Sequence, residues 1–94
     1  MDGAVHPRAR VVFIEGVFDR AAAAIVRSKL IDASSDVVVL DFGRAREVSD
    51  VALAALAGTI AGLERPRVVL RGLGHHHERM LRYLNLDVPI RGVA

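Results

Sequence analysis

The sequence predicts a small α/β domain whose central sheet is mostly parallel. Two observations lead to this fold class. Short apolar runs rich in β-branched residues alternate with longer runs of helix-forming residues, and the order strand–helix occurs three times in succession. Each helix would return the chain to the end at which the previous strand began, so that the strands run in parallel. A chain of 94 residues holds one such domain, which we expect to span residues 1–94.

The first strand and helix are predicted from "ARVVFIEG", residues 9–16, and "FDRAAAAIVRSKLIDAS", residues 18–34. The strand is apolar and β-branched, and it ends in glycine. The helix is rich in alanine, and Asp19 suits its N-cap because a carboxylate there accepts a backbone N–H of the first turn. The residues that we expect on the core side are spaced by four, with one neighbour beside them: Ala22, Val26, Leu30 and Ile25.

The second unit begins with "DVVVLDF", residues 36–42, a continuous apolar run between two acids. Such a run predicts a strand that is covered on both faces, as in many parallel sheets. "GRAREVS", residues 43–49, is predicted as a loop. A helix should follow from Asp50 to about Leu63, because its leucine and isoleucine residues form one apolar stripe: Leu53, Leu56, Ile60 and Leu63.

The third unit is predicted from "RVVLRG", residues 67–72, as a strand and "GHHHERMLRYLNL", residues 74–86, as a helix. Three residues should face the core on one side of this helix: Met80, Leu81 and Leu84. The remaining "DVPIRGV", residues 87–93, contains Pro89, which confines it to an edge strand or a loop.

Composition and charge exclude several classes of function. The chain has no cysteine, which removes disulfides, thiolate metal sites and cysteine nucleophiles. The net charge of +2 is small and the arginines are scattered along the chain, which argues against nucleic acid as a partner. The first residues lack the apolar core of a signal peptide, and no uncharged run reaches the ~20 residues of a membrane helix. We therefore expect a cytoplasmic protein that does not insert into membranes.

The helix predicted from Asp50 carries no charge between Asp50 and Glu64. Besides its leucine stripe it has a second stripe of small residues, which includes Ala52, Ala55 and Thr59. Such a helix is either enclosed in the core, or it offers its flat side to a partner. At its entrance, Ser49 or Asp50 can cap the first turn, and an acid there also meets the positive end of the helix dipole.

The run of histidines from His75 to His77 suggests a metal site, but neighbouring residues on a helix point about 100° apart. We therefore expect these histidines to diverge, and we predict neither a metal site nor a cofactor. Asp41 is interpreted as a strand-end or loop-closing residue. No set of nucleophile, base and orienting group accompanies the two acids Asp41 and Asp50, so the sequence predicts no catalytic residue and no enzyme.

The order and spacing of "EGVFD", "VVVLDFGRAREVSDVALAAL" and "RVVLRGLGHHHERMLRYLNLD" resemble the STAS domain family, from about Ala9 to Asp87. The first strand of that family ends in Gly-x-x-Asp, which Gly16 to Asp19 match, and its second strand ends in an aspartate, matched by Asp41. Asn85 stands where the family often has glycine. The resemblance implies a single STAS-like domain with its core at about residues 9–87. The best-known soluble members of the family are bacterial anti-sigma factor antagonists.

About eight residues after the strand-end aspartate, the family carries Asp-Ser-Ser-Gly-Leu at the start of a helix. In such antagonists, a kinase-type anti-sigma factor phosphorylates the first serine of this motif. An ungapped match from Asp41 puts Ser49 on the aspartate of the motif and Asp50 on the acceptor serine, with Val51 on the second serine and Ala52 on a glycine. Sliding the match by one residue puts Val51 at the acceptor. Neither register leaves a hydroxyl there, so the resemblance implies a module without the phosphorylatable serine. Asp50 would imitate phosphoserine only in part, because it has one charge on a shorter arm.

The resemblance implies a non-enzymatic regulatory module that binds a protein partner, a kinase-type anti-sigma factor. Its predicted partner-binding residues form three groups. The regulatory centre is Ser49, Asp50 and Val51. The rim is Arg44 and Arg46, and the floor, against which a partner would pack closely, is Ala52 and Ala55. One alternative is the STAS subunit of a lipid-transport ABC complex, which would bind the transporter ATPase through the same helix. An alternative of another class is a metal or small-ligand binding protein that uses His75 to His77 with Asp41 or Asp50.

Overall fold

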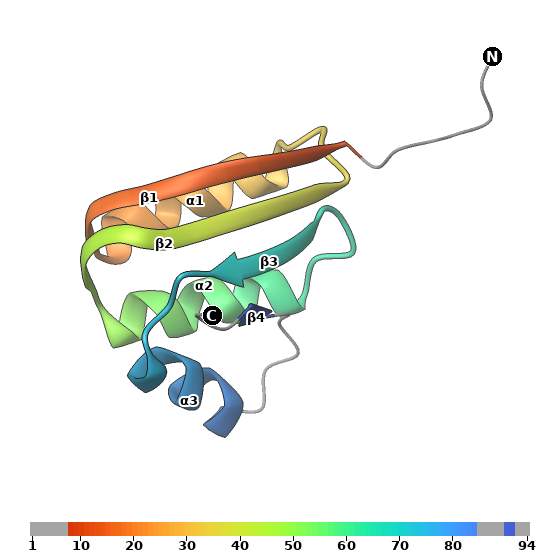
Figure 1. The fold of residues 1–94 in the computed structure, drawn as a ribbon. Helices are drawn as coiled ribbons and strands as arrows, with labels where there is room; N and C mark the ends of the chain where they lie inside the picture. The colour runs from red at the N-terminus through yellow and green to blue at the C-terminus, as the bar shows by residue number, and fades with distance from the viewer. Residues whose placement is uncertain (1–7, 85–89, 92–94) are drawn as a thin grey trace, which may run out of the picture.

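The computed structural model describes residues 8–84 and 90–91 of the chain. Its four strands are all parallel and follow the chain order β1-β2-β3-β4 across one sheet (Figure 1). The predicted α/β class and the strand–helix alternation are therefore confirmed. The elements have these bounds: β1 (Ala9–Phe18), α1 (Arg20–Ile31), β2 (Val37–Val48), α2 (Asp50–Ala61), β3 (Arg67–Arg71), α3 (His75–Tyr83) and β4 (Ile90–Arg91). Of these helices, none has the length and apolar character that crossing a membrane requires.

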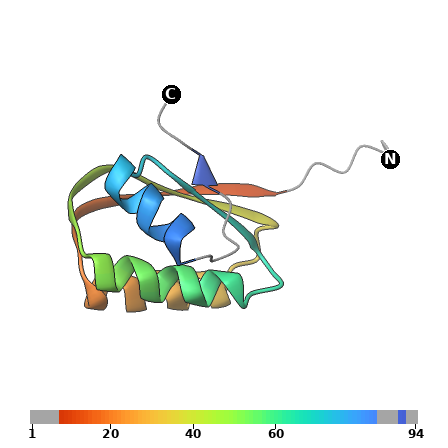
Figure 2. The ribbon, with the colours of Figure 1, turned by 90° about the horizontal axis from the view of Figure 1, so that it is seen from below.

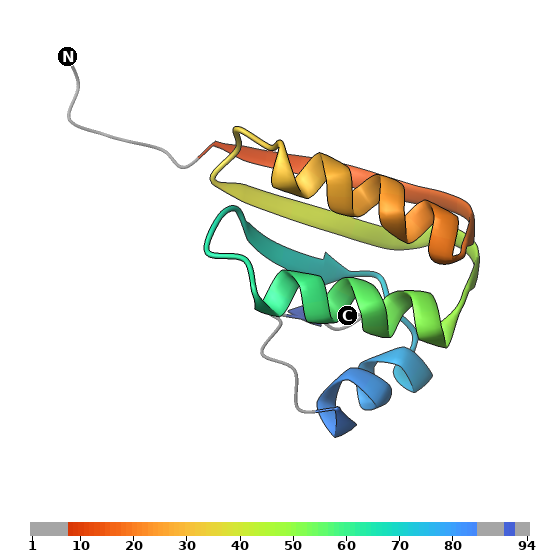
Figure 3. The same cartoon turned by 180° about the vertical axis from the view of Figure 1, so that it is seen from behind.

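Helices α1 and α2 lie side by side over one face of the sheet, as Figures 2 and 3 show. The prediction that β2 is covered on both faces is wrong. Val38 and Leu40 are buried, whereas Val37 and Val39 on the opposite face are only half-buried. Crossover connections between parallel strands have one preferred hand, so strands in sequential order place their helices on the same side. The other face keeps its β-branched residues without a covering helix among the described residues.

The segment predicted as a loop, residues 43–49, instead continues β2 as far as Val48. It pairs with the second half of β1, so that Glu15 lies opposite Arg44 and Phe18 opposite Val48. The pairing shifts register twice, and at each shift β2 has one residue more than β1, so the bulges lie in β2. Next to the second shift, Gly16 of β1 has a left-handed backbone with φ 71°. The paired second halves of β1 and β2, called here the β1–β2 ribbon, extend past the last residue of β3. Its charged residues, which suggested a loop, are exposed because only two strands pair there.

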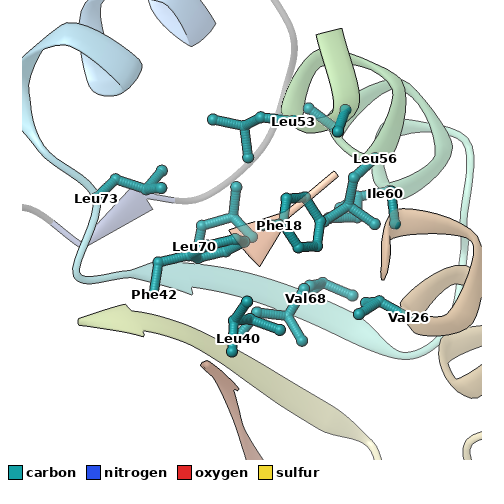
Figure 4. Packing of buried hydrophobic residues seen from close by; sticks show 14 of the residues in the cluster. Phe18, Val26, Leu40, Phe42, Leu53, Leu56, Ile60, Val68, Leu70 and Leu73 are labelled. Atoms are coloured by element: carbon teal, nitrogen blue, oxygen red, sulfur yellow. The ribbon is translucent and has the colours of Figure 1, made fainter. Parts of the chain in front are cut away.

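The core lies between the sheet and the two long helices (Figure 4). Phe18 packs edge-on against Phe42 with ring centroids 5.2 Å apart. The predicted stripe of α2 is confirmed for its buried members Leu53, Leu56 and Ile60, each of which contributes ~1.5–3 kcal/mol by burial. Other predicted core residues on α1 and α3 are buried as expected: Val26, Leu30 and Leu81.

Two predicted core residues are exposed instead. Ile25 is 59% exposed, because it lies about 100° around α1 from the buried Val26 and falls outside the contact with the sheet. Leu84 is 44% exposed, because α3 ends at Tyr83 and Leu84 serves only as its C-cap. Asn85 and Leu86, which the sequence predicts in the same helix, lie outside the described residues, as does most of the segment 87–93. Of that segment, Ile90–Arg91 forms the edge strand β4.

Asp41 ties β2 to the turn that follows β3. Its Oδ1 accepts the backbone N–H of Gly43 at 2.8 Å, and its Oδ2 accepts from Arg71 Nε at 3.0 Å and Nη2 at 2.9 Å. The N–H of Gly43 and then the Arg71 guanidinium lower the pKa of Asp41 by stabilising its carboxylate. Gly72 follows with φ 80°, and a Cβ at this position would lie 2.6 Å from the Gly43 nitrogen. The turn therefore needs glycine for two reasons, its backbone conformation and the close approach of β2.

We expect Gly72→Ala to destabilise the fold by roughly 2–4 kcal/mol, from left-handed strain and a clash with the backbone of Gly43. Gly74→Ala is the matched control, because Gly74 has an ordinary φ of −75° and open space around its Cα. The control should cost less than about 1 kcal/mol. Urea unfolding followed by circular dichroism measures both free energies of unfolding. Equal losses in the two variants would show that Gly72 imposes no special constraint.

Candidate functional site

The candidate site lies at the sheet edge where β2 and β3 end, and both α2 and α3 begin there (Figure 1). In parallel sheets the carboxyl ends of neighbouring strands share one edge, so the loops and helix starts that follow them are brought together. Here the two helix starts carry the Ser49–Asp50 pair and the histidine run, which are separated by about a quarter of the chain. The fold therefore makes neighbours of two motifs that the sequence presents separately.

Ser49 is the N-cap of α2. Its Oγ accepts the backbone N–H of Ala52 at 3.3 Å, and its own backbone N–H donates to the Phe18 carbonyl at 2.9 Å. Of the two candidate caps, the serine takes this role, and Asp50 is the first residue of the helix. Asp50 is thereby released from capping, and its half-exposed carboxylate can interact with other groups.

The carboxylate of Asp50 meets two histidines from the first turn of α3. His76 Nε2 lies 3.2 and 3.1 Å from its two oxygens, and His77 Nε2 lies 2.9 Å from Oδ1. The two imidazole rings meet edge-on, with centroids 4.9 Å apart. The prediction that neighbouring histidines diverge is wrong for this pair. Neighbouring side chains leave a helix about 100° apart, but both of these imidazoles reach the same carboxylate.

His75 takes no part in this cluster. Its side chain is exposed, and its Nδ1 lies 4.0 Å from Oε1 of Glu78. Glu78 is buried, and its Oε2 has no hydrogen-bond partner among the described residues. The three nitrogen and oxygen atoms that lie within 4.8 Å of one another belong to Asp50, His76 and His77. Of the two acids considered as partners for the histidines, the structure brings Asp50 to them and keeps Asp41 on Arg71.

The predicted rim residues lie on the β1–β2 ribbon. Arg44 pairs with Glu15 at 3.4 Å, and its guanidinium lies over the Phe13 ring, 4.2 Å from the centroid. Arg46 is exposed on the same strand. Arg44 is thus directed toward β1, so among the described residues the groups that contact the Asp50 carboxylate are the two histidines.

Helix α2 is neither fully enclosed nor fully exposed. Ala52 is 0% exposed and Leu53 lies in the core, while Val51 is 64% exposed and Ala55 and Gly58 are also exposed. The outer side of α2, defined here by Val51, Ala55 and Gly58, is therefore uncharged and open to solvent. The two predicted floor residues therefore differ in exposure: Ala55 is accessible to a partner, whereas Ala52 is buried.

A groove of about 260 Å³ runs beside this outer side, between α1 and α2. Small side chains of both helices keep it open, and two arginines of α1 border it. Its lining residues are Arg20, Ala23, Ala24, Arg27, Ala52, Ala55, Leu56 and Thr59. The predicted stripe of small residues thus faces this groove, which the sequence did not indicate because it depends on how α1 packs beside α2.

The pKa of the Asp50 carboxyl is lowered, first by the hydrogen bond with His76 and then by that with His77, while partial burial raises it. A carboxyl whose pKa is depressed on folding stabilises the fold at pH values above its unfolded pKa. This contribution is lost as the pH falls through the folded pKa. The contribution of the Asp50 carboxylate to the link between α2 and α3 should therefore be lost in acid, below about pH 4.

We predict that His76→Ala raises the pKa of Asp50 toward its ordinary value and that His77→Ala raises it by less, because His76 is the larger cause. His75→Ala should leave this pKa unchanged, since His75 does not contact Asp50. Titration of the Asp50 carboxyl carbon by NMR measures the pKa in each variant. An unchanged pKa in His76→Ala would contradict the contact.

Comparisons with known proteins agree with this architecture. A family model described as "Mlab, STAS domain" matches residues 3–92. The fold is similar to that of the anti-sigma factor antagonist SpoIIAA in its unphosphorylated form, with a TM-score of 0.68 and 13% sequence identity. That match covers 97% of this chain and 86% of the other. No curated protein sequence matches the chain. Because the family model spans nearly the whole sequence, the chain belongs to the STAS domain family.

Proposed function

We propose that this STAS domain is a non-enzymatic regulatory module that binds a protein partner in the cytoplasm, in the manner of an anti-sigma factor antagonist. The observation that carries the proposal is the outer side of α2, an uncharged helix face that stays open to solvent. Residues of this kind are normally covered, and an uncovered apolar surface rimmed by polar groups is typical of an interaction site. The similarity in fold to SpoIIAA supports this class of function.

The chemistry of the partner follows from what surrounds this face. Ala55 and Gly58 allow a partner backbone or helix to approach closely, and Val51 adds an apolar contact. The groove on one side is bordered by Arg20 and Arg27, which suit acidic groups on the partner. A kinase-type anti-sigma factor is the partner that the family resemblance supports.

The switch position differs from that of a phosphorylated antagonist. In the ungapped register Asp50 takes the acceptor position, and the neighbouring hydroxyl of Ser49 already accepts the helix-capping N–H of Ala52. The Asp50 carboxylate has one charge, against about −1.5 to −2 on phosphoserine, and His76 and His77 hold it toward α3. We infer that the module binds its partner without a phosphorylation cycle.

This missing acceptor also favours a second candidate partner, the ATPase of a lipid-transport ABC complex. An ATPase that docks on the outer side of α2 would need no acceptor hydroxyl. Affinity capture from native lysate followed by mass spectrometry separates the two proposals. Recovery of a kinase-type anti-sigma factor supports the first, and recovery of a transporter ATPase without a kinase supports the second.

We predict that Ala55→Arg weakens binding of the recovered partner at least tenfold, because a long charged side chain would cover the outer side of α2. Ala21→Arg is the matched control, since Ala21 is an exposed helical alanine that does not line the groove. The control should bind within about threefold of the unchanged chain. Calorimetry gives both affinities. If Ala55→Arg bound as tightly as the control, the partner would have to dock elsewhere.

We predict that a kinase-type anti-sigma factor transfers no phosphate to the unchanged chain, because neither Asp50 nor Val51 offers a hydroxyl. Asp50→Ser should become an acceptor if the ungapped register is right. Intact-mass measurement after incubation with the kinase and ATP detects one added phosphoryl group. Stoichiometric phosphate on Ser49 of the unchanged chain would refute both the register and the absence of a switch.

A further inference from the structure

The side chains of Asp50, His76 and His77 form a cluster that is separate from the outer side of α2, as defined by Val51, Ala55 and Gly58. We propose that these three residues bind one divalent transition-metal ion of the zinc class, at the junction of α2 and α3. The inference rests on the arrangement of the side chains alone. It goes beyond the proposed partner binding and does not depend on it.

The spacing of the three ligand atoms fits a single ion. Zinc lies about 2.0–2.1 Å from histidine nitrogens and about 2.0–2.2 Å from carboxylate oxygens. Tetrahedral ligands at such distances are roughly 3.3 Å from one another. In the structure the nitrogen–oxygen distances at Asp50 are 2.9–3.2 Å, and all three ligand atoms lie within 4.8 Å. An ion would be seated if the carboxylate oxygen moved outward by a few tenths of an ångström and the two imidazole nitrogens came to roughly 3.3 Å from each other.

The donor set selects the class of metal. Two imidazole nitrogens and one carboxylate oxygen suit zinc and its neighbours among the transition metals, whereas magnesium and calcium prefer oxygen ligands throughout. Three protein ligands leave the fourth tetrahedral position for water or for another ligand. His75 cannot complete the set, because its side chain turns to Glu78.

The ligands come from elements that the fold already holds in place. Ser49 caps α2 and fixes the residue that follows it, while α3 starts after the tight turn at Gly72. His77 is only 17% exposed, so the surrounding atoms restrict its side chain, and His76 is the more exposed ligand. A site that is largely arranged before the ion arrives loses less conformational entropy on binding than an unstructured run of histidines.

Calorimetric titration of the untagged full chain with Zn²⁺, after removal of metals by a chelator, tests the proposal. We expect one ion per chain, with the affinity lowered at least tenfold in His76→Ala, in His77→Ala and in the isosteric Asp50→Asn. His75→Ala is the control, because it removes a histidine from the same run but outside the cluster, and its affinity should stay within about threefold. Circular dichroism verifies that each variant is folded.

A second measurement reports whether the ion binds the folded arrangement. Zinc at about ten times its dissociation constant should raise the Tm of the unchanged chain and of His75→Ala by roughly 5–10 °C, and that of Asp50→Asn by far less. An equal loss of affinity in His75→Ala and His76→Ala would overturn the proposal, because it would indicate an unstructured histidine run. The absence of saturable binding would overturn it as well. Either result leaves the partner proposal intact, since no partner takes part in the measurement.

Discussion

The contact of Asp41 with Gly43, Arg71 and the turn at Gly72 is the constraint on which the candidate site depends. Asp41 is the last residue of β2 that pairs with β3, and its carboxylate binds the side chain of Arg71, the last residue of β3. Gly72 then passes so close to Gly43 that no side chain fits between them. The chain therefore leaves β3 in one direction, and α3 starts next to the start of α2.

Helix α2 satisfies two demands that usually conflict. One side must be large and apolar to fill the core beneath it, as Leu53, Leu56 and Ile60 do. The other side remains uncharged although it faces solvent, with alanine and glycine in place of the lysine and glutamate that cover most surface helices. Core packing explains the first side but not the second. Small uncharged residues on an exposed helix serve a close approach, which is why a protein partner accounts for this surface better than stability does.

The sequence alone predicted the elements that depend on local patterns. The three helices, the Asp19 cap and the buried stripe of α2 follow from periodicity and capping chemistry, which act over a few residues. The extension of β2 to Val48 could not be predicted in this way, because it depends on irregular, bulged pairing with the second half of β1. The meeting of His76 and His77 with Asp50 was missed for a similar reason. The signal was present, since both motifs follow neighbouring parallel strands. The prediction, however, considered only the angle between the histidines on their own helix and not a ligand from the start of α2.

Asp50, the first residue of α2, has a different role from the capping role that the sequence suggested. Ser49 provides the cap, so the fold does not need Asp50 for that purpose. An unneeded carboxylate at a helix start would ordinarily face water, where the helix dipole alone would favour it slightly. Instead it lies between two imidazole groups of another helix. Asp50 thus couples the start of α2 to α3. The cluster therefore lies at the start of the helix that the proposed partner would contact.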